Sequence, residues 1–169
     1  MPRSSLQDTA GLPDPLLQYN FDMILNDIPG GGGDSRRMML QCQTTSLPGM
    51  QLEQETAALH GIELNFAGRQ IWGKTFQATF LETRDVMARN AIRGWIEFAR
   101  SNRLNGGNYK AAYAKTITIL LYDDIPNIVR TINVMNCFPT QLDDVSLDGG
   151  QGGLVSVSAT WSYDWTEEG

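Results

Sequence analysis

The chain has 169 residues and a formal net charge of −6 at pH 7, and its 17 glycines with many Ser, Thr, Asn and Gln residues indicate a single all-β domain with frequent turns. The acidic balance disfavours a protein that grips nucleic acid, because phosphate binding needs clustered Lys and Arg. The sequence contains no apolar run of transmembrane length and no segment like a secretion signal, so we expect folding in a cytoplasm.

The first part of the chain predicts a flexible arm followed by a hairpin. Residues 1–15 combine three prolines with small polar residues, which is typical of a poorly structured lead-in, and residues 16–166 form the single predicted domain. Apolar and polar residues alternate over 19–26 and again over 38–43, with the glycine run 30–33 between them. Successive strand side chains point to opposite faces, so this pattern predicts two strands joined by a hairpin turn.

A turn and a long excursion come next. The Pro-Gly pair in Ser46-Leu47-Pro48-Gly49 predicts a turn. Residues 51–70 show neither a clean helical nor a clean strand period, with extended character returning between Ile62 and Phe66, and we interpret them as an excursion from the domain. Alternation resumes over residues 75–82 and predicts a further strand.

One amphipathic helix is predicted between Thr83 and Arg103, where apolar residues recur at three- and four-residue steps. Thr83 or Asp85 is the expected N-cap, and Asn105-Gly106-Gly107 is the expected stop. Five arginines make this helix basic within an acidic protein, which indicates either a solvated face or a surface that pairs with an acidic neighbour: Arg84, Arg89, Arg93, Arg100 and Arg103.

The last part of the chain predicts strands separated by a proline turn and a glycine turn. Two strands are expected around residues 116–121 and 132–134, followed by a turn at Phe138-Pro139-Thr140. A final strand from Val155 to Trp165 alternates apolar and hydroxyl side chains, with a predicted length of roughly 35 Å. Its polar face indicates either an ordinary wet sheet face or the lining of an aqueous channel.

The sequence shows no catalytic constellation. His60 is its single histidine and has no nucleophile motif nearby. The pairs Asp123-Asp124 and Asp143-Asp144 are typical of turns rather than of metal sites. Cys42 and Cys137 are too few for a disulfide framework and fit no zinc spacing. We therefore predict no enzyme, no catalytic residue, no metal and no cofactor.

Five segments, taken in order, resemble the tail tube family of contractile-tailed bacteriophages. The similarity covers roughly residues 15–165 and implies a β-sandwich or partial barrel with one flanking helix, related to the tubes of type VI secretion systems. The segments are LQCQTTSLPG (40–49), LNFAGR (64–69), TFQATFLETRDVMARNAIRGWIEF (75–98), NYKAAYAKTITILLYDD (108–124) and the ending from 129 to 165.

The resemblance implies a structural virion protein. Six subunits would form a ring, each lending strands to a continuous lumenal barrel, and stacked rings would form the inner tube of a contractile tail, the conduit for genome ejection. The implied partners are further copies of the chain, the tail sheath protein, baseplate and tail terminator proteins, and the tape measure protein and passing DNA, which the lumen does not bind specifically. The implied location is the virion, with assembly in the host cytoplasm.

The excursion between Leu47 and Gln70 and the N-terminal arm are the expected stacking elements. Two other functions stay open at this point: a baseplate tube initiator of the same fold, and a monomeric β-sandwich module that binds a ligand such as a sugar on exposed Trp and Tyr. The candidate subunit-interface residues are Leu47, Pro48, Gly49, Met50, Trp161 and Trp165.

Overall fold

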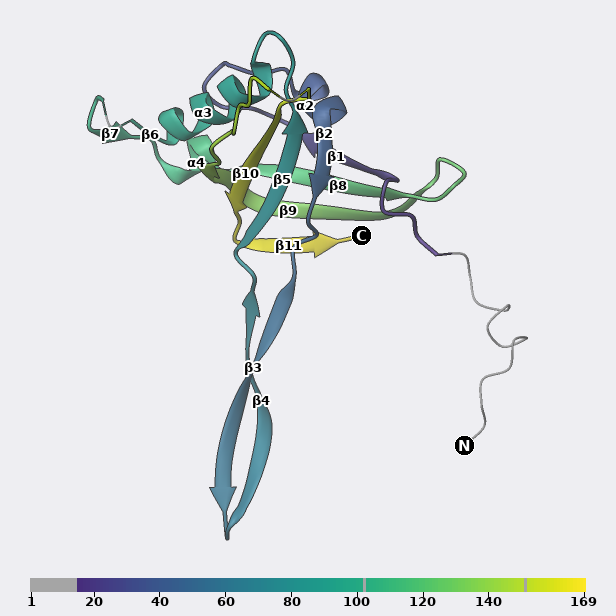
Figure 1. Cartoon of the computed structure of the whole chain (residues 1–169). Coiled ribbons are helices and arrows are strands. Elements are labelled where there is room, and N and C mark those ends of the chain that lie inside the picture. Colours follow the sequence, from purple (N-terminus) through teal and green to yellow (C-terminus); the bar gives the residue numbers. More distant parts are fainter. Residues whose placement is uncertain (1–14, 102, 151) are drawn as a thin grey trace.

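The computed structural model describes residues 15–101, 103–150 and 152–169 and shows two crossed β-sheets, a long projecting hairpin, and helices at the end opposite to it (Figure 1). The main strands are hydrogen-bonded in the order β1-β8-β9-β10-β5-β2, and β11 pairs with β9. The elements are β1 (Phe21–Leu25), α2 (Ser35–Gln41), β2 (Cys42–Thr45), β3 (Met50–Leu59), β4 (Ile62–Trp72), β5 (Thr75–Leu81), α3 (Met87–Ala99), β6 (Arg100–Ser101), β7 (Gly106–Gly107), α4 (Lys110–Tyr113), β8 (Lys115–Tyr122), β9 (Ile128–Leu142), β10 (Ser156–Ser162) and β11 (Trp165–Glu168).

The strand β9 belongs to both sheets. We call β1, β8, β11 and the first part of β9 the β8 sheet, and we call β2, β5, β10 and residues 138–142 of β9 the β5 sheet. Apolar side chains from the facing sides of the two sheets form the core, and α3 closes one end of it, where Trp95 packs edge-on against Trp161 at 5.3 Å between ring centroids. The predicted mainly β fold with a flanking helix is confirmed.

The predicted turn at Phe138-Pro139-Thr140 is wrong, because β9 continues through these residues as it passes from one sheet to the other. The strand pairs with β8 up to Cys137 and with β10 from Phe138 onward, and Asn136 takes a left-handed φ of 53° at the crossing. Pro139 pairs with Trp161 inside the ladder. Proline lacks an N–H, yet an edge strand tolerates it, and residues 138–142 of β9 are such an edge.

The predicted final strand is broken in two. After β10 the chain leaves the β5 sheet, and β11 begins on the β8 sheet at Trp165. The backbone N–H of Tyr163 donates to the carbonyl of Lys74 at 3.0 Å, and that of Asp164 donates to Met135 at 3.1 Å. The alternation places the buried side correctly from Val157 to Tyr163, whereas Val155 is exposed. The single long strand is wrong because the chain changes sheets.

The predicted hairpin between residues 19–26 and 38–43 is also wrong. Residues 35–41 form α2, while β1 pairs with β8 and β2 pairs with β5. The Asp34 carboxylate accepts a hydrogen bond from the backbone N–H of Arg36 at 2.9 Å and caps the helix. Met38 is buried and Leu40 is exposed, so the segment follows a helical period that the short alternation concealed.

The predicted amphipathic helix is confirmed as α3, but its predicted N-caps are wrong. The Glu82 carboxylate accepts hydrogen bonds from the backbone N–H groups of Ala88, at 3.1 Å, and Arg89, at 2.9 Å. This carboxylate satisfies N–H groups that lack a partner within the helix and stands at the positive end of its dipole. Thr83 and Asp85 bond to each other instead.

The predicted excursion is a long two-stranded hairpin, β3 and β4, which we call the arm (residues 50–72). It projects from the body on the side away from α2 and α3 (Figure 1). A register shift between Leu52 and Gln54 interrupts the pairing, and this bulge explains why the sequence shows no clean period of two.

Shorter elements were not predicted. The strands β6 and β7 pair with each other, so α3 ends at Ala99, earlier than the predicted glycine stop, and the single turn α4 precedes β8. Within the described residues, no helix has the length and apolar character needed to cross a lipid bilayer. The predicted N-terminal arm, residues 1–15, lies outside the described residues except for Pro15.

Candidate functional site

The arm ends in a tight turn that holds the single histidine. His60 has a φ of 51° and Gly61 a φ of 81°, so both central residues of the two-residue loop are left-handed. This is the turn geometry that matches the natural twist of a β-hairpin. His60 is exposed at the tip of the arm.

One face of the outer arm is an exposed apolar stripe. Leu59 pairs with Ile62 across the hairpin, Ala57 with Leu64, and Glu55 with Phe66, so these side chains share a face. The four large apolar side chains, which we call the arm stripe, are 41–63% exposed: Leu59, Ile62, Leu64 and Phe66. An isolated hairpin is marginally stable in water, and contiguous exposed apolar surface marks an interaction site. Exposed apolar side chains in this arrangement are typical of a contact surface.

The opposite face of the arm is polar. On this face Thr56 donates a hydrogen bond to Asn65 at 3.1 Å. Nearer the body, Arg69 forms an exposed ion pair at 3.3 Å with Glu53, which lies on the same side of β3 as Glu55 and Leu59. In each pair one residue lies on β3 and the other on β4, so the contacts join the two strands. In the outer arm, the four large apolar side chains therefore lie on one face, and the Thr56–Asn65 pair lies on the other.

The base of the arm holds four of the predicted interface residues. The N–H of Gly73 donates to the carbonyl of Gly49 at 3.0 Å, and the Tyr163 hydroxyl donates to the same oxygen at 3.2 Å. Leu47 and Met50, on either side of this clamp, are 51% and 55% exposed, and Pro48 is half-buried. The prediction at Leu47, Pro48, Gly49 and Met50 therefore falls on accessible surface held at a fixed position.

The two predicted interface tryptophans lie in different surroundings. Trp161 is 0% exposed in the subunit core, between Trp95 and Phe76, so its ring is not available to a neighbour. Trp165 begins β11 and is 37% exposed. Only Trp165 offers surface for contact, and Trp161 acts through the stability of the body.

Both sheets end in strand edges that lack a partner within the described residues. These edges are β2 and residues 138–142 of β9 on the β5 sheet, and β1 and β11 on the β8 sheet. A free edge presents a row of N–H and C=O groups that can pair with another chain. The body therefore has the means to extend its sheets into neighbouring copies.

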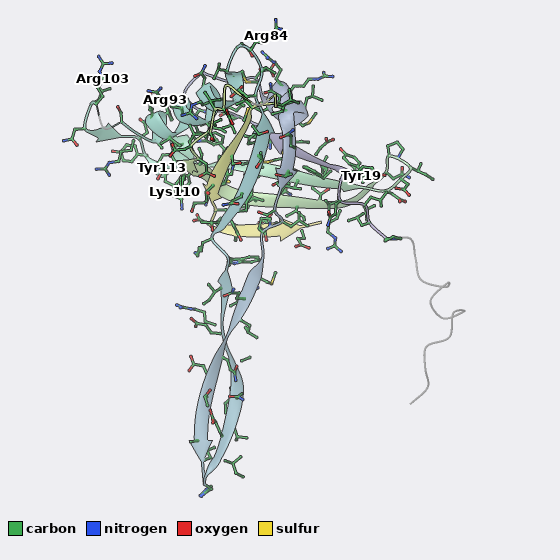
Figure 2. All side chains as sticks on the ribbon, in the orientation of Figure 1. Tyr19, Arg84, Arg93, Arg103, Lys110 and Tyr113 are labelled. Atoms are coloured by element: carbon green, nitrogen blue, oxygen red, sulfur yellow. The ribbon has the colours of Figure 1, made fainter. Side chains whose placement is uncertain are left out.

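Basic side chains gather at the helical end of the body, as Arg84, Arg93 and Arg103 show in Figure 2. Part of this charge is neutralised locally, because Arg93 pairs with Glu97 at 2.9 Å and Arg37 pairs with Asp85 at 2.8 Å. The pairing of this end with an acidic neighbour stays a prediction.

Exposed tyrosines do not gather into a sugar-binding platform. Tyr19 and Tyr109 are exposed. Tyr19 lies on the opposite side of the body from Lys110, the residue that follows Tyr109 (Figure 2). Trp165 lies in β11, whereas Tyr19 precedes β1 and Tyr109 precedes α4. Stacking of a sugar ring needs aromatic faces on one surface, and these residues do not supply it.

The aspartate pair Asp123-Asp124 lies in a turn, and the two cysteines are at least partly buried. The N–H of Asp124 donates to the Asp123 carboxylate at 2.7 Å, as expected of a turn. Among the described residues, no group of three or more His, Cys, Asp or Glu could hold a metal ion. Both cysteines are free. Burial raises the pKa of Cys42 to about 12 and also raises the pKa of Cys137, so both thiols are protonated at neutral pH.

The sequence interpretation did not find the arm stripe. Its four members alternate within β3 and β4 only when the chain is folded about the turn at residues 60–61. A His-Gly pair flanked by Leu59 and Ile62 was the available signal, since glycine suits a left-handed turn position.

The chain is similar to known tube proteins in both sequence and fold. A family model described as phage tail tube protein matches residues 15–167. A chain of the PVC extracellular contractile injection system, in its sheath/tube terminator in the extended state, has a TM-score of 0.68 at 19% identity, covering 94% of this chain and 99% of that one. A search of curated proteins gave no significant match.

Two further solved structures show the same fold. A chain of the anti-feeding prophage baseplate has a TM-score of 0.66 at 15% identity, covering 93% of this chain and 97% of that one. A chain of the PVC sheath-tube complex in the extended state has a TM-score of 0.63 at 19% identity, covering 99% of both chains.

Proposed function

This chain belongs to the phage tail tube protein family, and we propose that it is the repeating subunit of the inner tube of a contractile tail. Family membership makes it a structural protein of a phage tail. The observation that carries the finer proposal is the arm stripe, because a repeating subunit must present apolar surface to its copies and this chain does so on an element that projects from the body. The proposal gives the protein no catalytic role.

Six copies form a closed ring in this proposal. The free edges of the sheets pair with the edges of the neighbouring copies, so that one sheet continues around the ring. Closure removes the aggregation hazard of exposed edges, since each edge then has a partner. Head-to-tail contacts that close by rotation are the usual way to build such rings.

The arm joins successive rings. It projects from the side of the body opposite α3, so it reaches beyond the plane in which the bodies meet. Contact with the next ring buries the arm stripe and the base residues Leu47, Pro48, Gly49 and Met50, and Trp165 contributes from β11. Stacked rings make the tube that serves as the conduit for the genome.

The proposed partners follow the same arrangement. The outside of the tube contacts the sheath protein, its two ends contact baseplate and terminator proteins, and its lumen holds the tape measure protein and then passing DNA without specific binding. The names of the similar structures, which mention a sheath, a tube, a terminator and a baseplate, support these partners. The particle is the virion, assembled in the host cytoplasm.

A baseplate tube initiator is the alternative within the same fold. The similarity to a chain of a baseplate structure favours it as the second candidate. An initiator forms one ring at the end of a tube, whereas a tube subunit repeats, so length of assembly separates the two.

Negative-stain electron microscopy of the purified protein over a range of concentrations tests the proposal. We expect hollow tubes of uniform diameter that lengthen as the concentration rises. Single rings at every concentration indicate the initiator, and monomers that remain monomers when a baseplate complex is added contradict both.

A further inference from the structure

The helical end of the body carries an open groove that is lined mostly by apolar side chains. It lies between the start of α3 and the described residues that join β9 to β10, and its volume is about 850 Å³. We call its two arginines, Arg84 and Arg89, together with its exposed apolar residues, the helix groove. These apolar side chains are 39–83% exposed: Val86, Leu147, Leu154 and Val155. Contiguous apolar surface of this kind is typical of a contact with another molecule.

The two arginines make the helix groove basic. Arg84 is exposed at the end of the body opposite to the arm (Figure 2), and Arg89 is half-buried. Among the described residues, neither guanidinium has a carboxylate within ion-pair distance. Glu82 and Asp144 also line the groove, but the Glu82 carboxylate already accepts hydrogen bonds from backbone N–H groups at the start of α3. Two cations are thus left against the single carboxylate of Asp144.

The arm carries the complementary chemistry. Glu55 lies opposite Phe66 in the hairpin, so its carboxylate is on the same face as the arm stripe. It is exposed, and it forms no ion pair with another described residue. The arm as a whole holds Glu53, Glu55 and Glu63 against the single cation Arg69. An apolar stripe with an adjacent anion fits a surface that is both apolar and basic.

Repetition decides which surface an arm can meet. A contact between two arm stripes is symmetric, so it joins two rings and then stops. A tube that repeats needs a contact between two different surfaces of the subunit. Because the helical end lies opposite the arm, rings stacked in one orientation bring the helical end of one copy towards the arm of another (Figure 1). The helix groove lies at that end.

Resting on the tube role proposed above, we propose that the helix groove receives the arm of a copy in the adjacent ring. The arm stripe covers the exposed apolar side chains of the groove, and Glu55 pairs with the cations of Arg84 and Arg89. Burial of the two apolar surfaces drives the contact. The opposite charges fix which end of a ring meets the arms, since complementary charge sets the register of an interface.

Cross-linking within assembled tubes tests the placement of the arm. The double variant Leu64→Cys/Leu154→Cys places one thiol in the arm stripe and one in the helix groove. The native thiols add little background, because the pKa of Cys42 is about 12 and Cys137 is buried. Tubes are treated with a short bismaleimide and separated by denaturing electrophoresis. Leu64→Cys/Ile128→Cys is the matched control, since Ile128 is an exposed residue at the start of β9.

We expect the double variant to give covalent products larger than one ring, because each copy is linked through its arm to one neighbour and through its groove to another. The control should remain mostly monomeric, and each single-cysteine variant should give dimers at most. Products that stop at the size of one ring, a lack of products, or equal products from the control overturn the inference. Absence of tubes from the unmodified protein contradicts the proposed function instead.

Charge reversal tests the pairing independently and keeps the inference testable if the cysteine variant does not assemble. We expect Glu55→Arg, or Arg84→Glu with Arg89→Glu, to raise the protein concentration at which tubes appear by about tenfold or more. All three changes combined should lower it again. Glu63→Arg is the control, because Glu63 lies on the other face of the arm, and the groove changes should not rescue it. No loss from Glu55→Arg, or a combined variant no better than its parents, contradicts the pairing, provided that circular dichroism shows folded subunits.

Discussion

The arm and the body of this protein follow opposite rules of burial. In the body, the apolar side chains of two sheets and α3 cover one another, and Trp161 and Val134 are fully buried. In the arm, apolar side chains of similar size are about half exposed, and the two strands touch only each other along most of their length. The body is stabilised by its own contacts, whereas the arm leaves its apolar side chains uncovered, and in the proposed assembly a neighbouring copy covers them. Changes in the two regions should therefore affect different measurements.

The largest expected effect is on assembly, from a charge placed in the arm stripe. Leu64→Asp should abolish tubes, because burial of an unpaired carboxylate in an apolar contact is costly, and should leave the unfolding free energy of the subunit within about 0.5 kcal/mol of the original. Asn65→Asp is the matched control, since Asn65 is the next residue and lies on the polar face. Electron microscopy and urea unfolding give the two readouts. Tubes of normal length from Leu64→Asp would show that the arm stripe makes no essential contact.

A charge placed at the base of the arm should also block assembly without unfolding the subunit. Met50→Asp and Leu47→Asp are expected to block tube growth while the folded subunit persists, because both side chains are about half exposed beside the clamp at Gly49. Circular dichroism checks the fold and microscopy checks the tubes. Normal tubes from both variants would rule out the base of the arm as a subunit contact.

The core should show the reverse pattern. Trp161→Ala removes a fully buried ring that packs against Trp95 and Phe76, and we expect the subunit to lose about 3–5 kcal/mol of stability, measured by urea unfolding. Trp165→Ala is the control on the surface and should cost much less. A similar loss from both variants would erase the distinction between core and surface tryptophans.

A smaller loss is expected at the start of α3. Glu82→Ala leaves the N–H groups of Ala88 and Arg89 without their carboxylate partner, and we expect a loss of about 1 kcal/mol. Thermal unfolding followed by circular dichroism measures it. The arm should be unaffected, so tubes that form below the melting temperature should look normal; an unchanged melting temperature would contradict the capping role.

The smallest effect concerns an exposed carboxylate of the body. Hydrogen bonds from Arg37 and Thr83 lower the pKa of Asp85 from 3.8 to about 2. Because the folded pKa lies below the unfolded one, the stabilisation is present above the unfolded value and is lost as pH falls through about 2. Arg37→Gln should raise the pKa of Asp85 towards its ordinary value, which a carboxyl chemical-shift titration measures. An unchanged titration would show that Arg37 does not set this pKa.

The sequence predicted best where one local period decides the structure. The strands β5 and β8 and the helix α3 each have an apolar face at a clear spacing, and all three are confirmed. In α2 the period failed, because seven residues are too few to separate alternation from a helical repeat. The breaks at Asn136 and Tyr163 were missed because alternation reports which side of a strand is buried and not which strand lies beside it.

The candidate site was predicted in part for the same reason. Leu47 and Met50 flank a Pro-Gly turn that is visible in the sequence, and both are exposed. The arm stripe depends on the pairing of β3 with β4 and on the absence of cover, and neither is encoded in a local period. Trp161 illustrates the converse, since a tryptophan in a strand suits a core and an interface equally until the tertiary structure decides.

The path of β9 has a mechanical consequence. One unbroken strand carries the ladder of the β8 sheet and then that of the β5 sheet, and Asn136 is the point at which it turns from one to the other. A force that shears one sheet over the other must therefore break backbone hydrogen bonds of β9, whereas sheets held by side-chain packing alone could slide. The two sheets of each subunit are therefore joined through the backbone as well as by packing, and this resistance to sliding would suit the tube proposed above.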